Sequence, residues 1–278
     1  MTVWNAILLG LVQGVTEFLP VSSSGHLSII NNLFKISNIQ DGHLVFDVLL
    51  HLATLISILI VYWSDIVQMF YEVLAFVNIG PLADQQRTRY PAARLFLMIV
   101  FASLPLFLIL PVHDMVETLY YKNVFIGVAL ILTGCVLYVS DRMSPGKKTE
   151  RSMTILDALI IGLCQCVATI PGLSRSGVTI TAGIATGLRR DFALKFSFLM
   201  SLPAVFGANI LSLVDAVEAG GTDWHNVPAY LVGMVVALVS GVASIRLLNY
   251  INSKGKFGGF AYYCWVVGVL AIILTMIF

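Results

Sequence analysis

Long apolar runs recur along the chain, separated by shorter polar connections. A helix needs about 20 apolar residues to cross the hydrocarbon core of a bilayer. Six runs meet this requirement, at residues 45–63, 95–112, 123–140, 196–214, 227–248 and 260–278. The pattern therefore predicts an all-α polytopic membrane protein with about six transmembrane helices, forming a single integral membrane domain over residues 1–278.

Two further regions, 1–34 and 155–188, are apolar on average but are interrupted by Pro, Gly and clustered polar residues. Irregular backbone at membrane depth is tolerated only where it is buried in protein or lines a wet cavity. Both regions are therefore predicted to be re-entrant broken helices. In the first, Pro20 is expected to end a helix before a Ser-Ser-Ser-Gly loop that presents His26. In the second, a helix is expected to begin after Gly177.

The two interrupted regions resemble each other. Residues 10–25 laid over residues 162–177, at a constant offset of 152, pair GLVQGV with GLCQCV and SSSG with SRSG. The matches fall on unusual residues, among them Gln13 with Gln165. The chain is therefore predicted to contain two repeats, at about 1–112 and 155–278.

Charge along the chain predicts how these repeats are oriented. Lys and Arg concentrate in the connections 87–94, 142–151 and 246–256, whereas 113–122 and 215–226 carry net negative charge. The positive-inside rule places the basic connections in the cytoplasm and both termini outside. The first broken region then enters the membrane from the external face and the second from the cytoplasmic face. Inverted repeats with broken helices commonly build a polar site near the membrane midplane.

Overall composition agrees with a membrane protein. The chain is 58% hydrophobic and 11% charged, with a mean hydropathy of +0.91, whereas a soluble domain is about 25% charged. A net charge of +1 gives no indication of a nucleic-acid partner. Membrane lipid is the expected surrounding, and a homodimer is an assembly that the sequence leaves open.

The second motif, PGLSRSGVT, has the composition of an anion site. An Arg at membrane depth costs several kcal/mol unless an anion pairs with it, and Arg175 could pair with Glu17 or with a ligand. Small hydroxyls, exposed N–H groups at a helix start and a guanidinium together form a phosphate cradle. The predicted binding residues are Ser174, Ser176, Gly177 and Thr179. The alternative is that Arg175 only joins the two re-entrant helices through an ion pair with Glu17.

The first motif supplies reactive groups. Gln13 and Glu17 are four residues apart and share a helical face, and their oxygens could hold a divalent cation such as Mg²⁺. A serine assisted by His26 is the favoured nucleophile, with a phosphohistidine or an activated water as alternatives. Ser22 and Ser24 match Ser174 and Ser176 and are expected to bind substrate with Gln13, whereas Ser23 lies opposite Arg175 in the alignment.

Both motifs resemble the signatures of a known protein family. QGVTEFLPVSSSGH resembles the (E/Q)-x-x-x-E and P-V-S-S-(S/T)-G-H signature of the undecaprenyl-diphosphate phosphatases of the bacitracin-resistance type, and PGLSRSGVT resembles their P-G-x-S-R-S-G signature. FDVLLHLATL and DFALKFSFLMSLPAVFGA are also similar to family segments, so the resemblance covers nearly the whole chain. The first signature position is Gln13 here, which leaves Glu17 as the single carboxylate of the motif.

The resemblance implies hydrolysis of a polyprenyl diphosphate lipid, undecaprenyl diphosphate, to undecaprenyl phosphate and phosphate. This reaction recycles the lipid carrier for peptidoglycan synthesis and confers bacitracin resistance. The resemblance also implies a Mg²⁺ or Ca²⁺ cofactor and a bacterial plasma membrane, and we expect a site open to the external side. The predicted catalytic residues are Glu17, Ser23, His26 and Arg175. Because inverted repeats are typical of transporters, a flippase of polyprenyl phosphate or a small-anion carrier is the competing interpretation.

Overall fold

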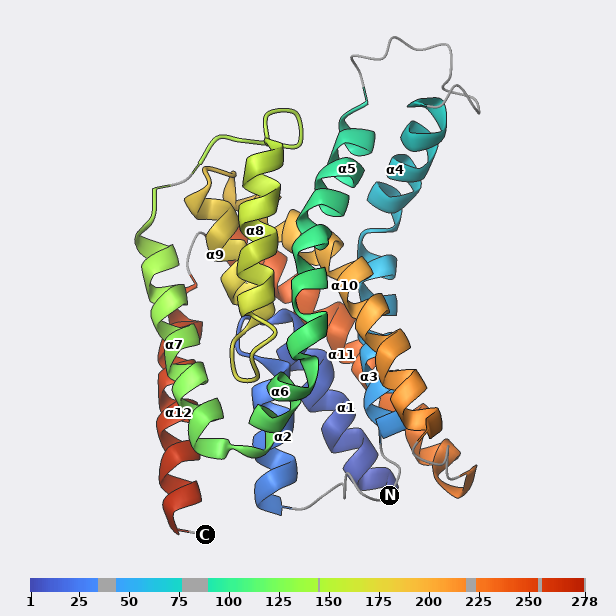
Figure 1. Ribbon diagram of the computed structural model, residues 1–278, viewed down its shortest axis with the longest axis vertical. Helices are drawn as coiled ribbons and strands as arrows, with labels where there is room; N and C mark the ends of the chain where they lie inside the picture. The colour runs from blue at the N-terminus through green and yellow to red at the C-terminus, as the bar shows by residue number, and fades with distance from the viewer. Residues whose placement is uncertain (35–43, 77–89, 145, 219–223, 255–256, 278) are drawn as a thin grey trace.

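The computed structural model describes residues 1–34, 44–76, 90–144, 146–218, 224–254 and 257–277, and this part of the chain is helical, as predicted. Figure 1 shows the arrangement of the helices. Their bounds are α1 Val3–Phe18, α2 Ser23–Phe34, α3 Leu44–Val61, α4 Trp63–Phe76, α5 Pro91–Ser103, α6 His113–Glu117, α7 Asn123–Arg142, α8 Ile155–Val167, α9 Arg175–Ala185, α10 Arg190–Glu218, α11 Val227–Ser253 and α12 Gly258–Ile277.

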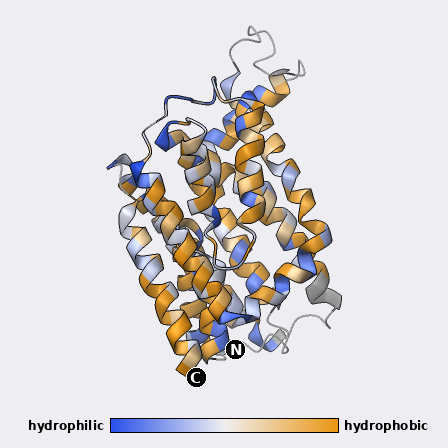
Figure 2. Ribbon diagram, turned by 60° about the vertical axis from the view of Figure 1, so that its left-hand side comes forward, coloured by the Kyte–Doolittle hydropathy of each residue, from blue (hydrophilic) through white to orange (hydrophobic). Residues whose placement is uncertain are grey.

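The predicted membrane spans are confirmed. Among the described residues, five helical segments are long and apolar enough to cross a bilayer, at Pro91–Tyr121, Asn123–Arg142, Arg190–Val214, Val227–Ser253 and Gly258–Ile277. A sixth span is obtained if the bent pair formed by α3 and α4 is counted as one. The apolar side chains along these helices are exposed, for example Val239 and Val266. Figure 2 shows hydrophobic residues along the helix lengths, which is the surface that a lipid environment requires.

Two spans are less regular than their hydropathy suggests. The run 45–63 leads into a second helix, α4, which the sequence analysis did not predict, and the two helices meet at an angle of 76°. The run 95–112 is α-helical only to Ser103 and continues as 3₁₀ turns that contain Pro105 and Pro111. Proline lacks an N–H and clashes with the preceding turn, so the α-helix cannot continue through these positions.

The two broken regions form hairpins that enter the molecule from opposite ends. In Figure 1, α1 and α2 rise from the lower end where the N-terminus lies, and α8 and α9 descend from the upper end. Their turns meet near the middle of the bundle. Both ends of the chain lie at the lower end, opposite the α7–α8 connection, as the charge pattern predicts. Residues 87–89 and 255–256 of the basic connections lie outside the described residues.

Glycines that allow close helix packing occur at equivalent positions in the two hairpins. A Cβ atom added to Gly10 in α1 would lie 2.4 Å from the carbonyl oxygen of Gly233 in α11. A Cβ atom added to Gly162 in α8 would lie 2.2 Å from the carbonyl oxygen of Ala102 in α5. Gly10 and Gly162 are separated by the same 152 residues as the motifs. Each hairpin therefore packs its first helix, through an equivalent glycine, against a helix from the other half of the chain.

The turns of the hairpins are also held in equivalent ways. Thr133 in α7 donates a hydrogen bond of 3.1 Å to the carbonyl oxygen of Gly172, and Cys264 in α12 contacts the carbonyl oxygen of Pro20 at 3.8 Å. Pro20 and Gly172 again differ by 152 positions. α7 and α12 pack against each other, so these contacts fix the two turns relative to each other at the centre of the molecule.

Candidate active site

The site is built on one face of α1. Gln13 and Glu17 lie one helical turn apart, as predicted, and the Gln13 amide Nε2 donates a hydrogen bond of 3.1 Å to Glu17 Oε2. The Glu17 side chain is only 7% exposed. Because a buried carboxylate is costly unless it is hydrogen-bonded or paired, the groups that contact Glu17 determine the chemistry of the site.

Two groups from opposite hairpins reach this carboxylate. The Ser23 hydroxyl, in the first turn of α2, donates a hydrogen bond of 2.6 Å to Glu17 Oε2. The Arg175 guanidinium, in the first turn of α9, donates one of 2.8 Å to Glu17 Oε1. The structure therefore brings Gln13, Glu17, Ser23 and Arg175 into direct contact across 158 residues of sequence.

Both helices that carry these groups begin with a serine cap. The Ser174 hydroxyl accepts a hydrogen bond of 3.1 Å from the Gly177 N–H, and the Ser22 hydroxyl accepts one of 3.2 Å from the Gly25 N–H. A serine that caps the third N–H of a helix fixes where that helix starts. The expected helix start after Gly177 is therefore wrong, because α9 begins at Arg175. The expected Ser-Ser-Ser-Gly loop is also shorter than predicted, since α2 begins at Ser23.

The positively polarised N-termini of α2 and α9 point toward the same region. A helix N-terminus has N–H groups without intrahelical partners and carries a partial positive charge. The hydroxyls of Ser24 and Ser176 lie 3.3 and 3.2 Å from those of Ser22 and Ser174, so all four hydroxyls belong to these two helix starts. Together with the guanidinium of Arg175, which is 21% exposed, they form a concentration of hydrogen-bond donors suited to an anion.

His26 lies on the same face of α2 as Ser23, three residues further on, but its hydrogen bonds go elsewhere. Nδ1 lies 2.7 Å from the carbonyl oxygen of Ser22, and Nε2 lies 2.8 Å from the hydroxyl of Tyr263 in α12. The Ser23 hydroxyl therefore has a carboxylate partner in this structure rather than the expected imidazole. Tyr263 was not identified from the sequence, where it is one of many aromatic residues in an apolar run.

One predicted binding residue points away from the donors. The Thr179 hydroxyl donates to the carbonyl oxygen of Arg175 at 2.8 Å and lies 2.6 Å from the hydroxyl of Ser197. Thr179 therefore packs α9 against α10. Thr133 in α7 was not identified from the sequence. Its hydroxyl accepts a 3.0 Å hydrogen bond from the N–H of Ser174 and so supports the cap of α9.

Gln13 provides an observation relevant to a divalent cation. Its Oε1 atom is buried and has no hydrogen-bond partner in the part of the chain that the structure describes. Within the same residues no cluster of three His, Cys, Asp or Glu side chains could hold a metal ion. Mg²⁺ is commonly bound by one or two protein oxygens, with waters and substrate phosphates completing its shell. Gln13 Oε1 beside Glu17 fits such a site, in which the protein supplies a minority of the ligands.

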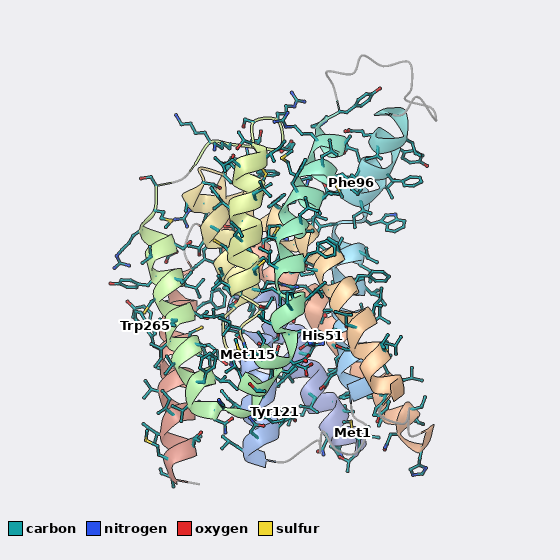
Figure 3. All side chains as sticks on the ribbon, in the orientation of Figure 1. Met1, His51, Phe96, Met115, Tyr121 and Trp265 are labelled. Atoms are coloured by element: carbon teal, nitrogen blue, oxygen red, sulfur yellow. The ribbon has the colours of Figure 1, made fainter. Side chains whose placement is uncertain are left out.

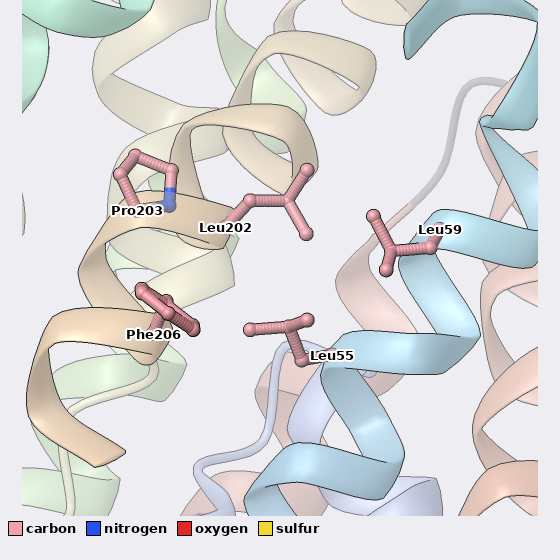
Figure 4. A pocket seen from close by; sticks show the side chains of 5 residues that line it. All are labelled: Leu55, Leu59, Leu202, Pro203 and Phe206. Atoms are coloured by element: carbon pink, nitrogen blue, oxygen red, sulfur yellow. The ribbon is translucent and has the colours of Figure 1, made fainter. Parts of the chain in front are cut away.

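Two further features are a histidine in α3, His51, which interacts electrostatically with Glu17, and an apolar hollow between α3 and α10. His51 in α3, labelled in Figure 3, places its Nδ1 2.9 Å from the carbonyl oxygen of Asp47 one turn earlier, a local bond within the helix. A hollow of about 230 Å³ lies between α3 and α10 (Figure 4). Its lining is entirely apolar, so it is not an anion site; the residues are Leu55, Leu59, Leu202, Pro203 and Phe206.

Comparisons with known proteins agree with this geometry. Residues 6–270 match the family described as "Bacitracin resistance protein BacA". A protein from Methanosphaera stadtmanae named "Undecaprenyl-diphosphatase" is 36% identical, with 100% of this chain and 99% of that protein covered. Proteins of the same name from Carboxydothermus hydrogenoformans and Alkaliphilus metalliredigens are each 37% identical and cover 99% and 100% of this chain, and 98% and 100% of their own lengths. The chain therefore belongs to the bacitracin resistance protein BacA family.

Proposed function

We propose that the chain is an undecaprenyl-diphosphatase, which hydrolyses undecaprenyl diphosphate to undecaprenyl phosphate and inorganic phosphate. This reaction would recycle the lipid carrier for peptidoglycan synthesis and would confer resistance to bacitracin. The observation that carries the proposal is the convergence of a serine, a carboxylate and an arginine at Ser23, Glu17 and Arg175, beside two helix N-termini. Full-length relatives with the same activity in their names support it.

In the proposed reaction, Ser23 is the nucleophile and Glu17 is its base. The Ser23 hydroxyl already donates to Glu17 Oε2 at 2.6 Å, a distance from which a carboxylate can take the proton as the oxygen attacks phosphorus. The bond from the terminal phosphorus to the bridging oxygen breaks, undecaprenyl phosphate leaves, and a phosphoserine remains. Water then attacks the phosphoserine, Glu17 returns its proton to the Ser23 oxygen, and inorganic phosphate is released. Direct attack by an activated water is the simpler alternative.

Arg175 would bind the diphosphate while it keeps its hydrogen bond to Glu17. A guanidinium has five N–H donors in a rigid fork, and only one Arg175 nitrogen, Nη2, is hydrogen-bonded to Glu17 at 2.8 Å. The remaining donors and the first-turn N–H groups of α2 and α9 would bind phosphate oxygens, together with the hydroxyls of the serine caps. Charge-assisted hydrogen bonds of this kind stabilise the negative charge that develops on the transferring phosphoryl group.

A divalent cation, Mg²⁺ or Ca²⁺, would be held by Glu17 and by Gln13 Oε1, which has no hydrogen-bond partner among the described residues. Diphosphate oxygens and waters would be its other ligands. It would neutralise part of the charge on the diphosphate. Gln13 is 0% exposed, so its oxygen is shielded from bulk water. Because its amide nitrogen faces Glu17, the amide would rotate for the oxygen to share a cation with that carboxylate.

The proposal includes the orientation of the protein in the membrane. The α1–α2 hairpin would enter from the external side and the α8–α9 hairpin from the cytoplasmic side, giving two inverted repeats in a plasma membrane. A substrate with its tail in the external leaflet would then reach Ser23 and His26 from that side. Both a monomer and a homodimer are compatible with this arrangement.

Phosphate release by the purified protein is the direct test. Undecaprenyl diphosphate in detergent, with and without Mg²⁺, should yield inorganic phosphate from the unmodified chain and at least about 100-fold less from Arg175→Ala. In liposomes, the competing transporter hypothesis predicts movement of labelled polyprenyl phosphate or phosphate without hydrolysis. Transport by a protein that releases no phosphate from the diphosphate would overturn the proposed function.

A further inference from the structure

The imidazole of His26 has a partner from the last helix of the chain. Tyr263 in α12 places its hydroxyl 2.8 Å from His26 Nε2, although 237 residues separate the two in sequence. Their rings also stack, with centroids 5.6 Å apart and an angle of 7° between the planes. Trp265, labelled on the same helix in Figure 3, shows where this stretch of α12 lies. Tyr263 thus contacts the edge of the imidazole through its hydroxyl, and its ring lies parallel to that of His26.

The hydrogen-bond partner of His26 Nδ1 indicates which ring nitrogen carries the proton in the neutral imidazole. His26 Nδ1 lies 2.7 Å from the carbonyl oxygen of Ser22, which can only accept a hydrogen bond. In the tautomer that makes this bond, Nδ1 carries the hydrogen and Nε2 has a lone pair. The Tyr263 hydroxyl is placed to donate to that lone pair. Both contacts favour the same tautomer.

The backbone at this point is held in an unusual conformation. Ser22 has φ of 71°, in the left-handed region that few residues other than glycine adopt. Its carbonyl oxygen accepts from His26 while its hydroxyl caps α2 through the Gly25 N–H. Strained backbone persists only where its surroundings fix it. The acceptor for Nδ1 is thus anchored by the start of α2, and Tyr263 fixes the opposite side of the ring from a different helix.

We propose that Tyr263 is a positioning residue for the diphosphatase reaction, which holds His26 in the Nδ1–H tautomer with Nε2 able to accept a proton beside Ser23. This inference rests on the proposed function. His26 lies three residues after Ser23 and so faces the same side of α2, where the phosphate transferred to Ser23 would lie. The Tyr263 ring limits the imidazole to one plane, and its hydroxyl, by donating to Nε2, keeps that nitrogen unprotonated. In the reaction the attacking water replaces the hydroxyl at this lone pair, and Nε2 then takes the water's proton. Without this contact, part of the population would carry a misdirected ring or the other tautomer.

Tyr263→Phe tests the hydroxyl, because it keeps the aromatic ring and its stacking. Loss of one hydrogen bond to the imidazole should lower kcat about three- to tenfold and leave KM within a factor of about two. Tyr262→Phe is the matched control, since Tyr262 is the neighbouring tyrosine on α12 and contacts Trp265 rather than His26. Tyr263→Leu, which removes the ring as well, should lower kcat further.

A spectroscopic measurement separates positioning from a general structural effect. In protein labelled with ¹⁵N-histidine, the His26 signals, assigned by their loss in His26→Gln, should show a protonated Nδ1 and an unprotonated Nε2 at high pH. Tyr263→Phe should move them toward a mixture of tautomers, whereas Tyr262→Phe should not.

The outcomes distinguish this inference from the proposed function. Equal kcat values for the two Phe variants, or His26 signals unchanged in Tyr263→Phe, would overturn the role of Tyr263 in a protein that remains an active diphosphatase. Absence of phosphate release by the unmodified chain would instead overturn the proposed function, and the ¹⁵N spectra would still report whether Tyr263 sets the tautomer.

Discussion

Glu17→Gln removes the charge on which the whole site converges, while keeping the size of the side chain. Removing one partner of a buried ion pair costs about 3–5 kcal/mol, because the other charge is left without compensation. Arg175 is 21% exposed and keeps part of its hydration, and the Gln amide oxygen can still accept one hydrogen bond. Both facts put the expected loss near the lower end, at about 3 kcal/mol.

The stability loss should be measurable as a fall in the thermal unfolding midpoint. For a chain of this size, ~3 kcal/mol corresponds to roughly 6–12 °C, by the scaling seen in domains of 150–250 residues. Phosphate release from undecaprenyl diphosphate should fall by about 100-fold or more, the usual effect of losing a positioned base. Both quantities can be measured on the same detergent-purified sample.

A double variant separates catalysis from a purely structural staple between the hairpins. The cost of Glu17→Gln comes from the uncompensated Arg175 charge, so combining it with Arg175→Met, which removes that charge, should recover much of the unfolding midpoint. It should not recover activity, because the base and the phosphate-binding guanidinium are both absent. Return of phosphate release together with stability would show that the pair only joins the hairpins. An unchanged midpoint and turnover in Glu17→Gln alone would refute the reasoning altogether.

Three further outcomes are expected. Ser23→Ala should lower kcat by about 100-fold or more if Ser23 is the nucleophile, whereas Ser28→Ala, a change to a buried serine on the same helix, should stay within about twofold; comparable rates would remove Ser23 from the mechanism. Gly162→Ala should destabilise the protein by about 1–3 kcal/mol, because its Cβ would lie 2.2 Å from a backbone oxygen of α5. Gly207→Ala, a change inside α10 that meets nothing within 4 Å, should leave the unfolding midpoint the same or raise it. Chelation with EDTA should abolish phosphate release and added Mg²⁺ should restore it, with a higher half-saturating Mg²⁺ concentration in Gln13→Ala; full activity in EDTA would contradict the proposed cation site.

The pairing of the two motifs could be anticipated from the sequence, but not the exact start of each helix. The offset of 152 between Gln13 and Gln165 predicted two related hairpins, and their positions in the structure agree with it. The expected loop of three serines became one capping serine and two helical ones. A serine can lie before a helix or inside its first turn, and the choice depends on which N–H its hydroxyl accepts, here that of Gly25.

The sequence by itself determined the membrane spans, the two broken helices, and the residues gathered at their turns, because hydrophobic runs, prolines and buried polar residues act locally along the chain. Tertiary structure alone decided which donor meets which acceptor. Ser23 could have bonded to His26 three residues away, yet it donates to Glu17, while His26 bonds to Tyr263 from the far end of the chain. Such choices depend on ångström-scale distances between helices packed from distant parts of the chain, and the order of residues does not encode those distances locally.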